Sequence, residues 1–263
     1  MAAAHPSRNH FLAGLTVEDS ALLRSQLVEA DLRVGGLLYV RGDRINEVVF
    51  PHSGVAVLRA SLRDGAGTGL ALIGRDGVVG GFAAKASAPA TCDCEILIEG
   101  KASYMTAAAF RYALDRSPTL RHWSSQFDNA LMAQTQQTAL CNATHSVEAR
   151  MCRWLLEVHE RSDDERIPLT QGALAELLGV RRTTVTVIAG ELADAGAIDC
   201  HRGYMRVADR AALEQRCCEC YAWLKSDARR LAPERDRALT AGAVRLRDGA
   251  VPKRDHSAAG SRS

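Results

Sequence analysis

The sequence predicts an α+β protein in which an N-terminal antiparallel β-roll, similar to a jelly roll, is followed by a long helix and a smaller helical domain. Two observations lead to this fold class. Residues 31–102 contain short runs of β-branched residues and leucine separated by Gly, Asp and Asn, which is typical of a compact antiparallel roll. After Thr106 the apolar residues recur three and four positions apart, which is the period of an amphipathic helix.

Composition and charge describe an ordinary globular chain. Its 263 residues suffice for two modest domains, and 47% are hydrophobic and 24% charged. No apolar run reaches the ~20 residues of a membrane helix, and the opening MAAAHPSRNHFLAGL lacks the charged start and apolar core of a secretory signal. We therefore expect a cytoplasmic protein with no membrane partner. Because the net charge is only +2, any anion must be bound by a local cluster of cations.

The N-terminal part, residues 14–117, is expected to form the roll. A short helix is predicted over residues 14–30, with Thr16 as its N-terminal cap. The stretch GTGLALIGRDGVVG then predicts a strand, a turn at Gly74–Gly77 and a second strand. Helical spacing returns at Thr106–Leu114, just before the long helix begins.

A long connecting helix is predicted over residues 118–146, because Pro118 is a favoured first helical residue and an apolar stripe follows it. The stripe consists of Leu120, Trp123, Phe127, Leu131 and Gln134. Such a stripe can pack on the roll or pair with its copy in a second chain, and we favour a dimer seam.

The domain after the long helix, residues 147–224, is predicted to contain a helix–turn–helix at residues 171–190. Amphipathic helices are expected at Val147–His159, Leu169–Leu178 and Arg210–Leu224. The sequence QGALAELLGVRRTTVTVIAG places apolar residues where two helices would meet, a small residue at their crossing and a glycine at the turn. These residues are Leu174, Ala175, Leu178, Gly179, Val180, Val185 and Ile188.

The β-branched run from Thr183 to Ile188 favours a strand by propensity alone. A helix containing it loses only a few tenths of a kcal/mol per residue, which packing can offset. The strand interpretation leaves the following GELADAGAI without a turn to explain it. We therefore favour the helix–turn–helix over a strand, and over a plain helical hairpin without a nucleic-acid role.

The outer face of the second helix carries the residues that we expect to contact DNA. Such a helix enters the major groove with its N-terminal residues against the base edges. Arginine can donate two hydrogen bonds to guanine, and threonine offers a hydroxyl to phosphate and a methyl group to thymine. The predicted DNA-binding residues are Arg181, Arg182, Thr183, Thr184, Thr186, Val187 and Arg202. Arg202 lies at the tip of a predicted hairpin, Ile198–His201 with Tyr204–Val207, which makes the domain a winged helix.

The chain resembles the Crp/Fnr family of bacterial transcription regulators over residues 14–224. GGLLYVRGD, VVFPHSGVAVL and LALIGRDGVVGG are similar to the family's sensor domain, and LTQGALAELLGVRRTTVTVIAGELADAGAI is similar to its DNA-binding motif. The resemblance implies a cyclic-nucleotide-binding-like domain at 14–117, a dimerisation helix at 118–146 and a winged helix at 147–224. It also implies a homodimer that binds a two-fold symmetric operator in double-stranded DNA, with RNA polymerase as a further partner.

The sensor region departs from the family's pattern, which puts the effector in doubt. Cyclic-nucleotide-binding members carry a Gly-Glu pair for the ribose and, about ten residues later, an arginine for the phosphate. Here Gly80 matches, Gly81 replaces the glutamate, and Pro89 or Ala90 replaces the arginine. Each lost contact should cost about 1.5–3 kcal/mol, so we expect cyclic AMP to bind poorly or not at all. An unknown small-molecule effector would have as its candidate pocket Gly80, Gly81, Phe82, Lys85 and Thr91.

Cysteine usage indicates free thiols in a cytosolic chain of this size. No cysteine precedes Cys92, so the N-terminal iron–sulfur ligands of oxygen-sensing members are absent and we expect no cofactor. Cys217, Cys218 and Cys220 form a dense cluster near the C-terminus. A metal site of this spacing usually needs a second pair of ligands, so we favour packing and expect no metal. A thiol-based redox or metal switch at these three residues remains an alternative.

Other functions find less support in the sequence. No G-x-S-x-G, H-E-x-x-H or phosphate-loop motif is present, so we do not expect an enzyme. A small-molecule sensor whose winged helix mainly contacts protein stays open as an alternative. Residues 225–263 are poor in large apolar side chains and are expected to be a disordered tail.

Overall fold

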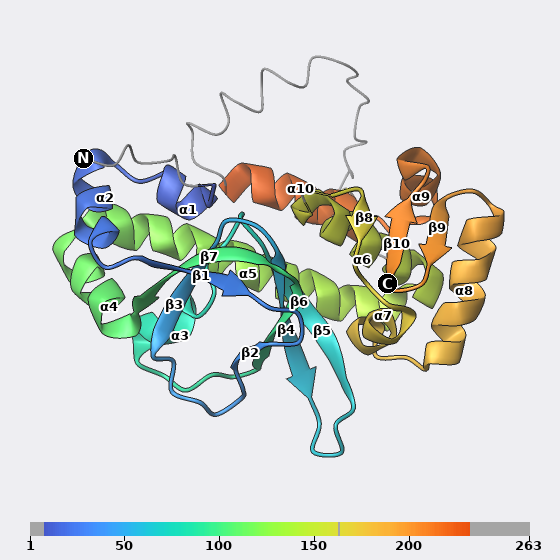
Figure 1. Ribbon diagram of the computed structural model, residues 1–263, viewed down its shortest axis with the longest axis horizontal. Coiled ribbons are helices and arrows are strands. Elements are labelled where there is room, and N and C mark those ends of the chain that lie inside the picture. The colour runs from blue at the N-terminus through green and yellow to red at the C-terminus, as the bar shows by residue number, and fades with distance from the viewer. Residues whose placement is uncertain (1–7, 163, 232–263) are drawn as a thin grey trace, which may run out of the picture. The chain divides into compact units, whose positions relative to one another are not determined.

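The computed structural model describes residues 8–162 and 164–231 and has the α+β fold expected from the sequence (Figure 1). The roll consists of two antiparallel sheets, a three-stranded sheet of order β1-β7-β3 and a four-stranded sheet of order β2-β6-β4-β5. The strands are β1 (Val28–Leu32), β2 (Leu37–Tyr39), β3 (Glu47–Pro51), β4 (Val55–Ser61), β5 (Gly67–Ile73), β6 (Asp93–Ile98) and β7 (Gly100–Thr106). Helices α1 (His10–Ala13), α2 (Val17–Arg24), α3 (Gly81–Ala86) and α4 (Ala107–Arg116) accompany them.

Two local expectations for the roll are wrong. The hydroxyl of Thr16 caps α2 by accepting a hydrogen bond from the Asp19 N–H at 3.1 Å, but the helix ends at Arg24 instead of continuing to residue 30. The next residues form β1, because pairing with β7 supplies them with a ladder of backbone hydrogen bonds. After the turn at Gly74–Gly77, the expected second strand is reduced to a single bridge between Val49 and Val79, and α3 follows.

The long helix α5 (Pro118–Thr144) begins at Pro118, and the Ser117 hydroxyl caps it by accepting from the Leu120 N–H at 2.9 Å. Its apolar stripe packs against the roll of the same chain: Leu120 is fully buried, and the Trp123 indole N–H donates to the Phe11 carbonyl at 3.1 Å. The side-chain oxygen of Gln134 accepts from the backbone of β5 at 2.6 Å. The stripe therefore packs on the roll, and pairing of α5 with a second copy stays a prediction.

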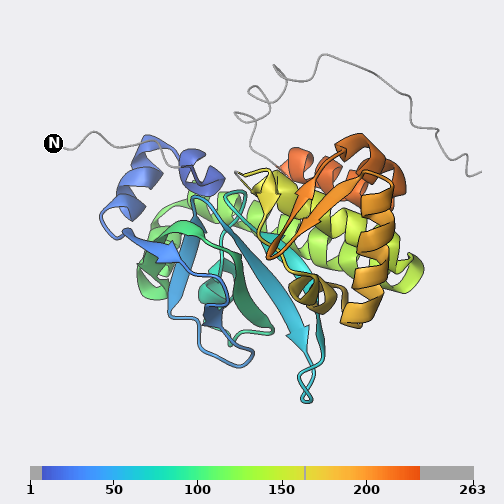
Figure 2. The same cartoon turned by 45° about the vertical axis from the view of Figure 1, so that its right-hand side comes forward.

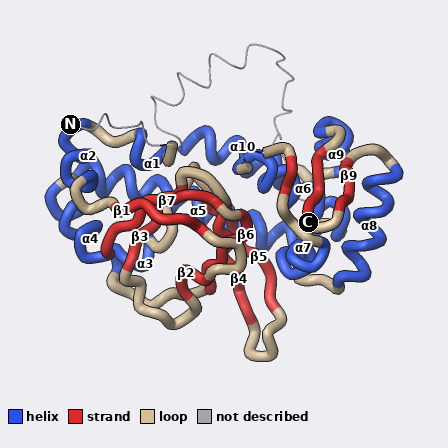
Figure 3. Tube along the Cα trace, viewed as in Figure 1, coloured by secondary structure: helices blue, strands red, loops and turns tan. Residues whose placement is uncertain are grey.

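The C-terminal domain joins helices to a small antiparallel sheet of order β8-β10-β9. Figure 2 shows helices α7 and α8 next to one another, with the β9–β10 hairpin beside α8, and Figure 3 shows these strands separate from those of the roll. The elements are α6 (Val147–Arg161), β8 (Arg166–Ile167), α7 (Gln171–Leu178), α8 (Arg182–Asp194), β9 (Ile198–His201), β10 (Tyr204–Val207), α9 (Arg210–Arg216) and α10 (Cys220–Leu231).

The predicted helix Arg210–Leu224 is divided into α9 and α10. Cys217 has extended backbone angles, φ −76° and ψ 150°, which end α9. Helix α10 continues to Leu231, beyond the expected start of a tail at residue 225, and residues 232–263 of that expected tail lie outside the described residues.

The roll and the helix–turn–helix domain share one apolar core, in which Val55, Val57 and Leu72 of the roll lie with α6 and α7. Thr68 in β5 donates a hydrogen bond to the Leu177 carbonyl at 3.0 Å, and Arg59 in β4 forms an ion pair with Glu176 at 2.7 Å.

In the described part of the chain, no helix is both long and apolar enough to cross a bilayer.

Candidate nucleic-acid interface

The turn between α7 and α8 has the geometry that the sequence predicted. The Thr170 hydroxyl caps α7 by accepting from the Ala173 N–H at 3.1 Å. The helix ends at Gly179, whose φ of +64° lies in the left-handed region that L side chains rarely adopt. A Cβ at this position would also lie 3.3 Å from the backbone oxygen of Gly67. The turn therefore favours glycine, and the close approach of the roll adds to this preference.

The two helices meet through the apolar residues named from the sequence. Leu174, Ala175 and Leu178 of α7 and Val185 of α8 are buried, and Ile188 packs against the same core. Val180, in the turn, is partly buried against it. Because this face of α8 is anchored in the core, its opposite face is presented to solvent in a fixed orientation.

The exposed residues of α8 and its N-cap match most of the predicted DNA-contacting set. Arg181, Arg182, Thr183, Thr186 and Val187 are exposed, with Val187 at 62%. The structure leaves Thr184 half-buried. The Thr186 hydroxyl is already engaged, since it lies 2.8 Å from the side-chain oxygen of Gln171 and 3.1 Å from the Arg182 carbonyl.

The arginine side chains at the start of α8 make no hydrogen bond or ion pair within the described residues, and the same is true of Arg202. Arg181 and Arg182 also lie at the N-terminal end of the helix, where unpaired backbone N–H groups and the helix dipole favour an anion. This end of α8 is therefore suited to a negatively charged partner.

The wing is the hairpin of β9 and β10, with Arg202 exposed at its tip and Gly203 at φ +89° in the turn. The rings of His201 and Tyr204 stack with centroids 4.5 Å apart, and the Arg166 guanidinium lies 5.6 Å from the Tyr204 ring centroid. Arg166, the first residue of β8, is a second cation beside the wing. The sequence did not reveal it, because the residues just before it mix acidic and basic side chains without a pattern.

Except for Thr91, the predicted effector residues lie in and next to the short helix α3 (Gly81–Ala86). Gly81 is buried at the start of α3, Phe82 is 55% exposed, and Thr91 is exposed. Lys85 forms an ion pair with Asp128 of α5, so its charge already has a partner. A pocket of about 520 Å³ lies nearby, and its lining includes none of the five predicted residues. It is lined by Leu38, Tyr39, Asp43, Arg44, Ile45, Asn46, Glu47, Val49 and Val79.

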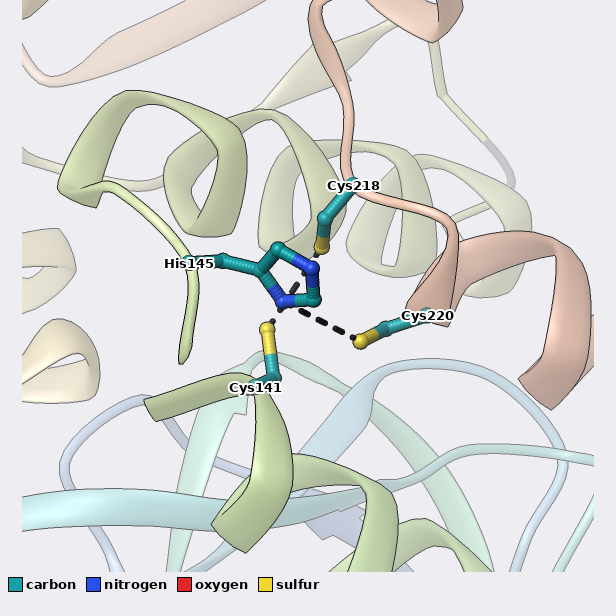
Figure 4. A group of neighbouring side chains, drawn as sticks. All are labelled: Cys141, His145, Cys218 and Cys220. Carbon is teal, nitrogen blue, oxygen red and sulfur yellow. Dashed lines mark hydrogen bonds between the residues drawn. The ribbon is translucent and has the colours of Figure 1, made fainter. Parts of the chain in front are cut away.

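Four side chains of the kinds that can ligate a metal lie together where α5 meets α10. Figure 4 shows His145 among the sulfur atoms of Cys141, Cys218 and Cys220. The expected cluster of Cys217 with its two neighbours is therefore only partly right, because Cys217 is not in the group. Sequence reasoning missed Cys141 and His145, since nothing local connects them to cysteines more than 70 residues away. The expectation of no metal, which rested on the spacing of Cys217, Cys218 and Cys220, is therefore not confirmed.

Burial and mutual contacts affect the thiols of this group. The hydrogen bond with Cys218 and burial raise the pKa of the Cys141 thiol, while the charge of Arg153 opposes the rise. Burial likewise raises the pKa of the Cys220 thiol.

Comparisons with known proteins agree with this architecture. Residues 149–216 match the family model described as a Crp-like helix-turn-helix domain. The structure of FixK2 from Bradyrhizobium japonicum is similar with a TM-score of 0.63 at 15% identity, covering 73% of this chain and 98% of that one. A CRP/FNR family transcriptional regulator from Thermus thermophilus has a TM-score of 0.58 at 24% identity, covering 72% and 97%.

The regulator CLP from Xanthomonas campestris, described as c-di-GMP responsive, has a TM-score of 0.61 at 14% identity, covering 74% of this chain and 100% of that one. No curated protein matches the sequence.

The structural similarities and the match to the family model show that the chain has the fold of the Crp/Fnr regulators and carries a Crp-like helix–turn–helix domain.

Proposed function

Since the chain has the Crp/Fnr fold and a Crp-like helix–turn–helix domain, we propose that it is a dimeric transcription regulator that binds a specific DNA sequence through α8 and the wing. The observation that carries this function is the set of unpaired arginines, Arg181, Arg182 and Arg202, on a rigidly held helix start and a neighbouring hairpin tip. RNA polymerase is the further partner of such a regulator. We propose no catalytic activity.

In this function the residues of α8 have separate roles. Arg182 would donate to the edge of a guanine, Thr183 would contact phosphate or a thymine methyl, and Val187 would offer apolar contact only. Arg181 and Arg202 would bind phosphates and set the position of the helix. Thr184, which is half-buried, would contribute less than the sequence pattern implied.

A homodimer is supported by the face of α5 that does not touch the roll. Met132 is 52% exposed and Leu140 is 54% exposed, with the exposed Gln136 between them at helical spacing. Residues 129–144 contain no charged side chain, which is unusual for a solvent-facing helix and favours burial against a second copy. A two-fold symmetric pair would bind half-sites roughly 34–36 Å apart.

Cyclic AMP is not the effector in this proposal. A cyclic phosphate needs a cationic side chain that is not already paired with a carboxylate, whereas Lys85 forms an ion pair with Asp128. Gly81 has no carboxylate to accept hydrogen bonds from a ribose. The signal that the roll transmits would be another molecule.

Selection of bound duplexes from a random pool, followed by titration of the selected duplex, tests the DNA-binding function. Arg182→Ala should weaken binding by roughly 5–150-fold per half-site, since a good arginine–guanine pair contributes about 1–3 kcal/mol. Arg33→Ala removes the same charge from an exposed position in the roll and should leave the affinity within about twofold. If no sequence is enriched, or if the affinity for DNA does not change with salt concentration, the result would instead favour a winged helix that contacts protein.

A further inference from the structure

Four potential metal ligands converge from two distant segments of the chain. Cys141 lies in the last turn of α5 and His145 is the residue that ends this helix. Cys218 lies between α9 and α10, and Cys220 is the first residue of α10. The ligand atoms of all four lie within 4.8 Å of one another (Figure 4).

The separations between these atoms are close to those of a tetrahedral site. The Cys141 and Cys218 sulfur atoms are 3.5 Å apart, and the Cys220 sulfur is 3.5 Å from Nδ1 of His145. Bond lengths of about 2.3 Å to sulfur and about 2.0–2.1 Å to nitrogen give edges of about 3.5–3.8 Å in a tetrahedron. The longest separation would shorten by about 1 Å on binding, a shift that side-chain rotation can supply.

The surroundings hold a positive charge that has no carboxylate partner. Arg150 is 9% exposed, and its guanidinium donates to the side-chain oxygen of Asn142 at 2.9 Å and to the Leu178 carbonyl at 3.4 Å, both neutral. No ion pair of Arg150 with an acidic residue occurs among the described residues. A divalent ion held by three thiolates and a neutral imidazole carries one net negative charge, which would compensate this buried cation.

Simple packing of cysteines explains less of the arrangement. Cys141 and Cys220 are fully buried and Cys218 is 8% exposed, as small apolar residues would be. Packing gives no reason for an imidazole nitrogen to point at the sulfur atoms. It also leaves Nε of the buried Arg150 guanidinium without an acceptor.

We propose that Cys141, His145, Cys218 and Cys220 bind a Zn²⁺ ion in a closed, structural site. Three sulfur donors and one nitrogen donor select a soft tetrahedral ion, and a full set of four protein ligands leaves no position for a substrate. The ion would join the end of the long helix to the segment that follows the winged helix. It would thus hold α10 alongside α5, with which α10 packs.

Binding of Co²⁺ to the full chain tests the site, since Co²⁺ in a tetrahedral thiolate site has intense visible bands and a thiolate charge-transfer band. We expect the chain to purify with one Zn²⁺, and the apo chain, prepared with chelator and reductant, to take up one Co²⁺ with this spectrum. Added Zn²⁺ should then abolish the spectrum. A weak Co²⁺ spectrum of the octahedral type, or no uptake of Co²⁺ by the reduced chain, would overturn the proposal. A Cys141–Cys218 disulfide would also overturn it if the chain binds no metal after this bond is reduced.

Variants identify the ligands. Cys218→Ser and His145→Ala should each weaken Zn²⁺ binding roughly 100-fold or more, whereas Cys217→Ser, next to the site, should bind as the unmodified chain does. Loss of the metal in Cys217→Ser with retention in Cys218→Ser would refute the ligand set. If a variant fails to fold, alkylation of the unmodified chain decides: Zn²⁺ should protect Cys141, Cys218 and Cys220 but leave the reactivity of the exposed Cys200 unchanged. If the alkylation is followed until these three buried thiols of the apo chain have reacted, an unchanged rate in the presence of Zn²⁺ would count against the site.

Discussion

Replacing Gly179 by alanine tests the position of the helix–turn–helix, because the same substitution at Gly190, eleven residues later, should have the opposite effect. Gly179 has φ +64°, where an L residue loses about 1–2 kcal/mol. The new Cβ would also lie 3.3 Å from the Gly67 oxygen and from Thr68 of the roll, so a neighbour must move. Gly179→Ala should therefore destabilise the folded chain by about 1–2 kcal/mol.

Gly190 lies inside α8, is exposed, and has nothing within 4 Å of the position of an added Cβ. Alanine there should stabilise the helix by about 0.5–1 kcal/mol, since glycine loses more backbone entropy on folding. Thermal unfolding of the two variants measures the difference. We expect Tm to fall by about 2–8 °C for Gly179→Ala and to rise by about 1–4 °C for Gly190→Ala. A Tm that does not fall in Gly179→Ala would refute the left-handed turn at residue 179.

Three further outcomes are expected. Met132→Glu combined with Leu140→Glu should convert a dimer to a monomer in sedimentation, whereas Val17→Glu, at an apolar position with 88% exposure, should leave the dimer intact. A dimer that persists in the double variant would exclude this face of α5 as the dimer interface. Saturating cyclic AMP should change neither Tm nor the affinity for the selected duplex, and a shift in either would show that the roll binds it. Burial and the charge of Arg210 lower the pKa of His159 in the folded chain. The unfolded chain therefore protonates this imidazole more readily, and the free energy of unfolding should fall as the pH drops below about 6.5. His159→Gln should reduce the slope of Tm against pH, and an unchanged slope would contradict this assignment.

Local patterns in the sequence were sufficient for the helix–turn–helix. Its requirements lie within twenty consecutive residues: an apolar face on each helix, a small residue at the crossing and a glycine at the turn. Val185 is buried and Val187 is exposed as that pattern required, although both belong to a run that favours a strand by propensity. Propensity was overridden because burial of one face of α8 contributes more than the small helical cost of β-branched residues.

Local patterns failed where the partner of a segment lies far away in the chain. Residues 28–32 form a strand instead of the predicted helix, because they pair with β7, which lies about seventy residues later in the chain. The stripe of α5 is apolar on either interpretation, and only the folded chain shows that the roll covers it. Periodicity reports which face is buried, but not by which element.

The sequence by itself thus determined the α+β class, the roll, the long helix and the helix–turn–helix, because each depends on spacing between neighbours in the chain. Only the tertiary structure decided which arginines remain unpaired, which partner holds Lys85 and which cysteines meet. Cys141 and Cys218 are 77 positions apart and come within 3.5 Å because α10 packs along α5. A ligand set of this kind is a property of packing, and no spacing along the chain records it.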